Sequence, residues 1–245
     1  MSELVAIIGG TGLTALEGLE ITHREMMYTP YGEASSPITH GKYSGKPVIF
    51  LPRHGSRHTI PPHKINYQAN IWCLKELGVK NIIAVAAVGG INMDMKPQDL
   101  VIPHQLVDYT WGRKHTFFED TDVQHIDFTD PYTFELREKL LNAAKDLGFP
   151  VHDKGVYAAT QGPRLETTAE IDRLEKDGCD LVGMTGMPEA ALAREAEINY
   201  ATCALIVNEA AGRGPEQITM EDIERNLEGG IQRVRELLSK VLTLI

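Results

Sequence analysis

The chain opens with Leu4-Val5-Ala6-Ile7-Ile8-Gly9-Gly10-Thr11-Gly12, a short apolar run that passes directly into a glycine-rich loop. A run of this length bounded by glycine is typical of a strand that is buried on both faces of a sheet. Glycines after such a strand let the backbone come close to a bound anion or turn tightly against a neighbour. The stretch therefore predicts a buried first strand, followed either by an anion-binding loop or by a tight packing turn.

Six more apolar runs predict further strands: Pro47–Leu51, Ile82–Val88, Leu100–Ile102, Gly155–Thr160, Leu181–Gly183 and Tyr200–Val207. Five segments between and after these runs predict helices: Tyr67–Leu77, Tyr132–Leu147, Ala169–Lys176, Glu189–Ala196 and Thr219–Leu244. Strands that alternate with helices predict an α/β fold with a central mixed, largely parallel β-sheet flanked by helices. No repeat or linker interrupts the chain, so we expect residues 1–245 to form a single domain.

Composition and charge argue against several classes of partner. The formal net charge of −10 disfavours nucleic acid and anionic membrane surfaces. No apolar run approaches the roughly 18 residues of a membrane span, and the N-terminus lacks the pattern of a signal peptide. The cysteines are few and without metal-site spacing, which predicts reduced thiols: Cys73, Cys179 and Cys203. We therefore expect a cytoplasmic protein without a nucleic-acid or membrane partner.

The glycine loop also satisfies the dinucleotide-binding pattern G-x-G-x-x-A, with Gly10, Gly12 and Ala15 at its fixed positions. That fingerprint requires a helix directly after the loop and then a second parallel strand. Here Gly18 interrupts the segment, and Ile21–Thr29 is rich in β-branched and polar residues. We therefore reject a dinucleotide site. The loop is either an anion nest, to which Thr11 adds a hydroxyl donor, or a tight turn that packs the strand on a neighbour.

Arg53-His54-Gly55 follows the second apolar run and offers a second set of anion ligands. An Arg at a strand end can place two parallel donors on a phosphate, and the adjacent His can donate to the same anion. Other motifs occur in a fixed order around this pair: Ile7–Gly12, His58-Thr59-Ile60, Asn66–Asn70, Gln161-Gly162-Pro163-Arg164, and Met184-Thr185 with Pro188-Glu189. This ordered set resembles the trimeric purine-nucleoside phosphorylases, especially the 5'-methylthioadenosine phosphorylase branch, from about Val5 to the final helix.

The resemblance implies where the phosphate and the sugar bind. The phosphate ligands implied are Thr11, Arg53, His54 and Thr185. Family members often carry a hydroxyl residue after the third core strand, but this chain has Ala86-Ala87-Val88, so we expect a backbone N–H of Ala87 or Val88 to serve instead. Met184 corresponds to the residue that lies under the sugar.

Two positions in the implied base pocket differ from the methylthioadenosine branch. That branch has a small hydroxyl residue where this chain has Glu166, and two Asp where this chain has Asn208-Glu209-Ala210. A 6-oxopurine presents N1–H to a carboxylate and O6 to an amide, whereas a 6-aminopurine would confront Glu166 with an acceptor. We therefore predict a 6-oxopurine pocket in which Asn208 and Glu166 are the catalytic pair and Glu209 and Ala210 also contact the substrate.

The implied 5' pocket favours a thioether over a hydroxyl group. Met220, with Ile223 one turn further on, takes the place of the family His that binds a 5'-hydroxyl, and both side chains are apolar. We therefore predict phosphorolysis of S-methyl-5'-thioinosine to hypoxanthine and 5-methylthioribose 1-phosphate. The alternatives are a methylthioadenosine phosphorylase, a general inosine/guanosine phosphorylase, a nucleoside hydrolase or a non-catalytic binding module.

The resemblance also has implications for assembly and cofactors. A homotrimer is expected, and His125 either reaches a neighbour's sugar pocket or lies in a surface loop. Inorganic phosphate is expected as a co-substrate, with no cofactor and no metal taking part in the reaction.

Overall fold

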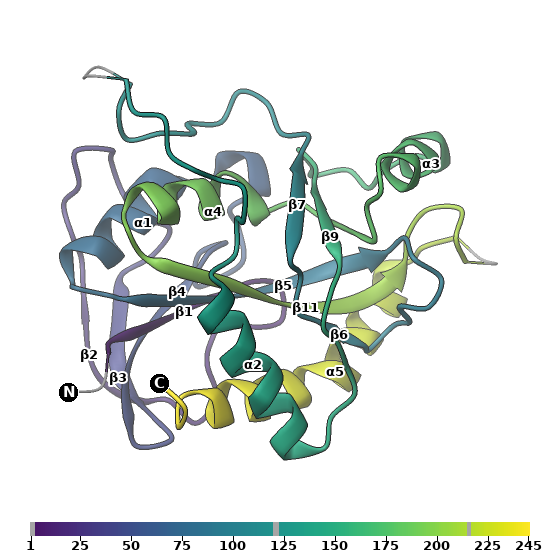
Figure 1. The fold of residues 1–245 in the computed structure, drawn as a ribbon. Coiled ribbons are helices and arrows are strands. Elements are labelled where there is room, and N and C mark those ends of the chain that lie inside the picture. The colour runs from purple at the N-terminus through teal and green to yellow at the C-terminus, as the bar shows by residue number, and fades with distance from the viewer. Residues whose placement is uncertain (1–2, 120–122, 215–216) are drawn as a thin grey trace.

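The computed structural model describes residues 3–119, 123–214 and 217–245 (Figure 1). One mixed sheet runs through this part of the chain. Its strands are β1 (Val5–Gly9), β2 (Glu20–Glu25), β3 (Ile38–Tyr43), β4 (Lys46–Pro52), β5 (Asn81–Gly90), β6 (Leu100–Val101), β7 (Gln105–Asp108), β8 (Val151–His152), β9 (Val156–Ala159), β10 (Leu181–Gly183) and β11 (Asn199–Glu209). The main path follows the order β2-β3-β4-β1-β5-β10-β9-β7, and β11 pairs with β5 and β6.

Helices cover the sheet on both faces (Figure 1). They are α1 (Tyr67–Glu76), α2 (Phe134–Leu147), α3 (Thr168–Lys176), α4 (Gly186–Glu195) and α5 (Met220–Val241), with a short 3-10 helix at Pro62–Lys64. Helices α1 and α4 share one buried cluster with the sheet, and α2 and α5 share another on the opposite face. Helix α5 is long because its apolar residues recur every three or four positions, as in Ile223, Leu227, Gly230 and Val234.

The centre of the sheet is parallel and leaves an opening at one place. Strand β5 pairs in parallel with β1 only as far as Ala84, and β10 joins the same edge antiparallel from Gly89. Residues 85–88 of β5 therefore have no neighbouring strand on that edge. Ligands of open α/β sheets bind beyond the carboxyl ends of the strands, where neighbouring strands diverge. We therefore expect a ligand-binding site at the unpaired edge of residues 85–88 in β5.

The glycine loop makes two close contacts that a side chain would prevent. A Cβ on Gly10 would lie 2.5 Å from the Val85 carbonyl oxygen. Gly12 has a φ of +80°, and a Cβ there would lie 2.6 Å from the Leu227 side chain of α5. The chain then continues through turns rather than a helix until β2 begins. The helix that a dinucleotide fingerprint requires is therefore absent from this fully described segment.

The structure confirms the predicted fold class and each predicted helix and strand to within a few residues. Four strands were not predicted: β2, β3, β7 and β8. Strand β2 is exposed along most of its length and polar, so its sequence has no buried face to reveal it. Helix α4 begins three residues earlier than predicted, at Gly186.

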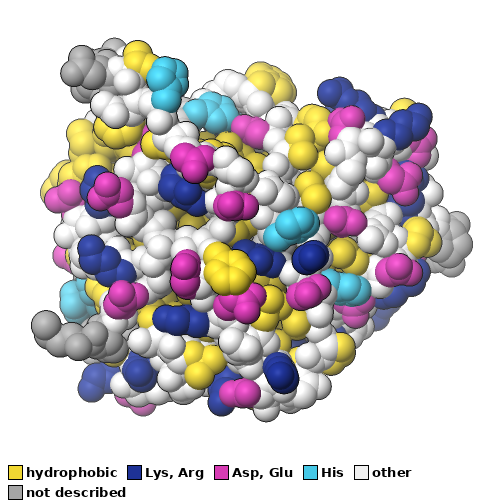
Figure 2. Space-filling model, in the orientation of Figure 1, with side chains coloured by type: hydrophobic (Ala, Val, Ile, Leu, Met, Phe, Trp, Pro, Cys, Tyr) yellow, Lys and Arg dark blue, Asp and Glu magenta, His cyan; other side chains and the backbone are white. Residues whose placement is uncertain are grey.

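The surface carries acidic and basic side chains side by side. Figure 2 shows Asp and Glu interspersed with Lys and Arg over the face drawn. No helix in the described residues is long and apolar enough to cross a membrane.

Candidate active site

A cavity of about 540 Å³ opens at the carboxyl ends of the central strands. Twelve of the fourteen predicted site residues line it, namely Thr11, Arg53, His54, Ala87, Val88, Glu166, Met184, Thr185, Asn208, Ala210, Met220 and Ile223. They come from seven separate segments of the chain, which the sheet brings to one place. The order of motifs along the sequence thus corresponds to one cavity in space.

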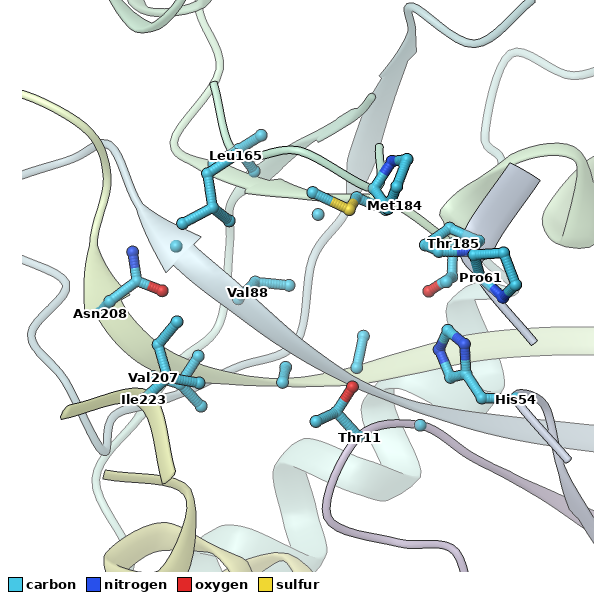
Figure 3. Close-up of a pocket in the computed structure, with 18 of the residues that line it drawn as sticks. Thr11, His54, Pro61, Val88, Leu165, Met184, Thr185, Val207, Asn208 and Ile223 are labelled. Carbon is cyan, nitrogen blue, oxygen red and sulfur yellow. The ribbon is translucent and has the colours of Figure 1, made fainter. Parts of the chain in front are cut away.

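The cavity has two chemically different ends. Figure 3 shows Thr11, His54 and Thr185 gathered at one end and Asn208 at the other, with Val88 and Met184 between them. Anion ligands thus lie apart from an amide, separated by apolar side chains. This spacing suits an elongated ligand with an anion next to one end and a polar ring at the other.

Arg53 is fixed by a buried ion pair. It is 1% exposed, and its Nε and one terminal nitrogen donate to the two Glu189 carboxylate oxygens at 2.6 and 2.7 Å. The other terminal nitrogen donates to the Val85 carbonyl at 3.1 Å, on the open edge of β5. Burial alone lowers the pKa of Arg53, but the Glu189 carboxylate outweighs it and holds the pKa above the ordinary value. The two-donor fork expected on phosphate is therefore turned to Glu189, and only the remaining N–H groups can face an anion.

The buried carboxylate has a second partner. Tyr200 of β11 donates its hydroxyl to Glu189 at 2.8 Å, and Glu189 is fully buried. A carboxylate with three donors can remain charged in the interior. Glu189 therefore sets the position of Arg53 from α4. The sequence analysis quoted Glu189 within a motif but assigned it no role.

His54 is neutral and its tautomer is fixed by its surroundings. Its Nδ1 lies 2.8 Å from the Ile60 carbonyl oxygen, which can only accept, so Nδ1 carries the proton. Burial and then the Arg53 cation lower the pKa of His54 to about 4. Nε2 of the neutral ring is thus an acceptor, which corrects the expectation that His54 donates to the anion. A phosphate that still carries a proton can donate to it.

Thr11 and His58 form a second polar contact at the same end. The Thr11 hydroxyl lies 3.1 Å from His58 Nε2, and the His58 ring lies 4.6 Å from the His54 ring. His58 also lines the cavity. The sequence analysis included His58 only as part of a motif. The structure adds it to the polar groups around the predicted anion position.

Thr185 and Ala87 complete this end of the cavity. The Thr185 hydroxyl makes no capping bond to α4, although Thr185 is the N-cap residue. In a β-strand, the N–H and C=O groups of one residue point toward the same edge of the strand, and those of the next residue point toward the opposite edge. Because the Val85 carbonyl faces Arg53 on the open edge, Ala87, two residues on, presents its N–H to that edge. Of the two expected backbone donors, the geometry favours Ala87 over Val88.

Glu166 is held from behind by a hydroxyl group. Thr160, just after β9, donates to Glu166 Oε1 at 2.7 Å, and Glu166 is half-buried beside the cavity. The second carboxylate oxygen keeps its lone pairs for a ligand. Glu166 is therefore a positioned acceptor in the cavity wall rather than a freely solvated acid.

Asn208 lies at an irregularity in β11. The pairing of β11 with β5 shifts by one residue between Ile206 and Asn208. Asn208 donates one Nδ2 hydrogen to the Glu209 carbonyl at 2.8 Å, and Figure 3 shows Oδ1 turned into the cavity. A β-bulge commonly redirects a side chain next to an active site. Asn208 thus offers an acceptor and a remaining donor to a ring.

Two predicted residues lie outside the cavity. The Glu209 carboxylate pairs with Lys96 at 3.2 Å and is not among the residues that line the cavity, so its contact with substrate stays a prediction. Val207, Asn208 and Ala210 of the same segment do line the cavity. His125 is exposed and also lies away from the cavity of its own chain.

The wall beside Asn208 is apolar. Ile218, Met220 and Ile223 line it at the start of α5, together with Val207. Met220 is 64% exposed while Ile223 is 8% exposed, so Met220 forms the rim and Ile223 the base of this wall. Among the described residues, this wall offers no polar side chain as a partner for a hydroxyl group, so it suits an apolar substituent.

Arg113 supports the wall from outside. It is 8% exposed and donates to the carbonyl oxygens of Met184 at 2.9 Å, Gln161 at 2.9 Å and Thr160 at 3.2 Å. It also donates to the Tyr67 hydroxyl at 3.2 Å. Arg113 therefore connects three segments that carry cavity residues. The sequence held no signal for it, because it follows a loop without a motif.

The comparisons with known proteins agree with this geometry. A family model described as the Phosphorylase superfamily matches residues 4–243, so the chain belongs to that family.

Individual relatives are similar over nearly the whole length. A probable S-methyl-5'-thioinosine phosphorylase of Pseudomonas syringae pv. tomato is 57% identical, over 97% of this chain and 98% of that protein. A 6-oxopurine nucleoside phosphorylase of Pyrococcus furiosus is 45% identical, over 98% of this chain and 92% of that protein. A solved methylthioadenosine phosphorylase of Schistosoma mansoni in complex with adenine superposes with a TM-score of 0.95 at 31% identity, covering 99% and 91% of the two chains.

Proposed function

We propose that the protein is a pentosyltransferase that cleaves S-methyl-5'-thioinosine with inorganic phosphate, yielding hypoxanthine and 5-methylthioribose 1-phosphate. The observation that carries this proposal is one cavity holding a fixed carboxylate acceptor, Glu166, near an apolar wall at Ile218, Met220 and Ile223. Relatives that are 57% and 50% identical bear the name of the same activity, with the word probable.

The base end selects a 6-oxopurine by hydrogen-bond matching. Glu166 accepts from the N1–H of the ring, and Thr160 keeps its carboxylate in place. Asn208 donates its remaining Nδ2 hydrogen to O6, and its Oδ1 accepts from N7–H once the departing base is protonated at N7. A 6-aminopurine has no N1–H, so binding it would place two acceptors face to face at a cost of about 1–3 kcal/mol.

The 5' end selects a methylthio group by polarity. A hydroxyl at this wall would be buried beside Ile223 without a hydrogen-bond partner, which costs about 1–3 kcal/mol. A thioether lacks a donor and packs well on aliphatic and methionine side chains. The wall therefore disfavours inosine while it accepts methylthioinosine.

The chemistry is a single displacement at the anomeric carbon. A phosphate oxygen forms the new bond to C1' as the C1'–N9 bond breaks, and the electron pair moves onto the purine. The purine anion then takes up a proton from solvent water and leaves as hypoxanthine. Arg53, Thr11, Thr185 and the Ala87 N–H hold the phosphate against the sugar. Asn208 stabilises the charge that develops on the departing base. Positioning and electrostatic stabilisation account for the rate.

We also infer a cytoplasmic homotrimer. The three cysteines are free and buried, as expected in a reducing compartment. The family resemblance supports the trimer, in which His125 of one subunit completes a neighbour's sugar pocket. Phosphate enters as a co-substrate, and the proposed reaction uses no cofactor or metal.

Glu166→Gln tests the assignment of base specificity. The amide can donate to N1 of a 6-aminopurine, so the kcat/KM ratio of methylthioinosine to methylthioadenosine should fall at least tenfold. Steady-state kinetics on both nucleosides measure the ratio. The matched control is Glu175→Gln, since Glu175 pairs with Arg213 on the surface of α3. An unchanged ratio in Glu166→Gln would refute the base assignment.

A further inference from the structure

The β2–β3 hairpin at the end of the sheet carries a cluster of three side chains that bind metals in other proteins. Imidazole nitrogens of His23 and His40 and a carboxylate oxygen of Glu25 lie within 4.8 Å of one another, a grouping found at this one place in the described residues. None of the three lines the cavity. The proposed reaction therefore gives them no role.

The backbone places these three side chains together. His23 and His40 are direct partners in the antiparallel register of β2 and β3. Glu25 lies two residues after His23, so its side chain emerges on the same face of the sheet. The convergence thus follows from strand pairing and not only from the rotamers of exposed side chains.

The side chains are also oriented toward one another. The two imidazole rings stack with centroids 4.2 Å apart and planes 13° from parallel. His40 Nε2 lies 2.6 Å from Glu25 Oε1, so a proton is held between a nitrogen and an oxygen that both ligate metals. Zinc binds His nitrogen and carboxylate oxygen at about 2.0–2.2 Å. Binding of one ion requires a small separation of His40 and Glu25 and a turn of the exposed His23 ring, because the nitrogen lone pairs of stacked imidazoles lie in parallel planes.

We propose that His23, Glu25 and His40 form a binding site for one divalent transition metal ion of the zinc type. Two imidazoles and one carboxylate favour Zn²⁺, Ni²⁺ or Cu²⁺, whereas Mg²⁺ and Ca²⁺ prefer oxygen ligands. His40 is 20% exposed and Glu25 39%, so the ligands are partly ordered and an ion can still reach them. On binding, the ion displaces the His40 proton to solvent, and water fills the remaining coordination position.

The site would act on an edge of the sheet. Strand β2 pairs with β3 alone and is exposed along most of its length. An ion held by both strands ties the edge strand to its neighbour and stabilises the folded state by mass action. The role is therefore structural and separate from the cavity.

Calorimetric titration of ZnCl₂ into metal-free, full-length protein tests the site directly. We expect saturable binding of one ion per chain, and no comparable binding of MgCl₂. His40→Gln and Glu25→Gln should each weaken zinc binding at least tenfold. His152→Gln is the matched control, because His152 pairs with Asp99 at 3.1 Å as another half-buried His-carboxylate pair.

A second variant and a second measurement distinguish the loss of the zinc site from misfolding of the variant. His23→Asn changes an exposed side chain, and should lower zinc affinity while leaving phosphorolysis and the unfolding temperature of the metal-free protein unchanged. Zinc should raise the unfolding temperature of the wild type more than that of His23→Asn. Absence of saturable zinc binding, or equal affinity in wild type, His40→Gln and His23→Asn, would overturn the proposal without touching the proposed enzymatic function.

Discussion

At the scale of single residues, Asn208 is the side chain that we propose to contact the departing base. Removing it deprives the leaving group of its hydrogen bonds, which strengthen as charge develops on the purine. Asn208→Ala should therefore lower kcat by about 10²–10³-fold, with a smaller change in KM. Steady-state kinetics at saturating phosphate measure both constants, and a rate equal to that of the wild type would exclude the role given to Asn208.

His54 links the cavity to the pH dependence of stability. Because burial and Arg53 lower its pKa to about 4, the unfolded chain, with a His pKa of about 6.5, binds more protons below neutrality. The contribution of His54 to the unfolding free energy is thus complete above pH 6.5. As the pH falls toward 4, the unfolding free energy decreases by about 3 kcal/mol on account of His54.

His54→Asn removes this titration while an amide replaces Nδ1 as the donor to Ile60. Urea unfolding at pH 7.5 and pH 4.5 should show a larger loss of stability for the wild type than for the variant. Equal losses in the two proteins would mean that folded His54 titrates as it does in the unfolded chain.

The site residues that could be predicted from the sequence are those whose place in a motif decides where they lie in the fold. Glu166 and Asn208 were assigned from their place in two motifs, and both line the cavity. The direction of the Glu209 side chain, toward Lys96 and away from the cavity, could not be predicted, because it depends on the irregularity in β11 and on a partner distant in sequence. Thr160, Glu189 and Arg113 act through other residues, and sequence alone does not show which distant groups a side chain contacts.

At the scale of elements, Arg113 binds separate segments together. Its guanidinium connects the end of β9, the Gln161 loop and the residues at Met184 that precede α4. Arg113→Met would leave several buried carbonyl groups unpaired, at about 1–3 kcal/mol each. We expect a loss of at least about 3 kcal/mol in unfolding free energy and a raised KM for the nucleoside.

Chemical denaturation and kinetics together check this expectation. Arg173→Met is the control, because the Arg173 side chain is 72% exposed, and its contacts with Asp177 and the Tyr109 ring lie at the surface. A variant as stable as the wild type, with the same KM, would show that the wall does not depend on Arg113.

The elements that sequence predicted are those with a buried face. Strand β5 is buried almost throughout and reads as an apolar run, and α5 shows its helical spacing. Strands β2, β3 and β7 carry polar or exposed residues, and β8 has only two residues, so local pattern could not reveal them. Their pairing is decided by neighbours distant in sequence, which only the assembled sheet supplies.

At the scale of the whole molecule, the cavity of one chain lacks the predicted His125. We expect sedimentation equilibrium to give three times the chain mass of 27.1 kDa. His125→Ala should then raise the KM for the nucleoside several-fold without dissociating the trimer. A monomeric active enzyme, or a His125→Ala variant with unchanged kinetics, would remove His125 from the site.

We propose that this acidic molecule binds phosphate through hydrogen-bond donors that are gathered in one place. The net charge is −10, yet Arg53, the Thr11 and Thr185 hydroxyls and the open edge of β5 converge on one end of the cavity. Net charge therefore describes the surface, while the sheet opening decides where phosphate binds.

We propose that one cavity combines a 6-oxopurine end with a 5'-methylthio end. The kcat/KM values for methylthioinosine, methylthioadenosine and inosine, measured side by side with and without phosphate, test this combination. We expect that cleavage requires phosphate and that the kcat/KM for methylthioinosine exceeds the values for both other nucleosides by more than tenfold. A preference for methylthioadenosine would contradict the roles of Glu166 and Asn208. A preference for inosine would contradict the role of the apolar wall at Met220 and Ile223. Cleavage without phosphate would contradict the phosphorylase reaction itself.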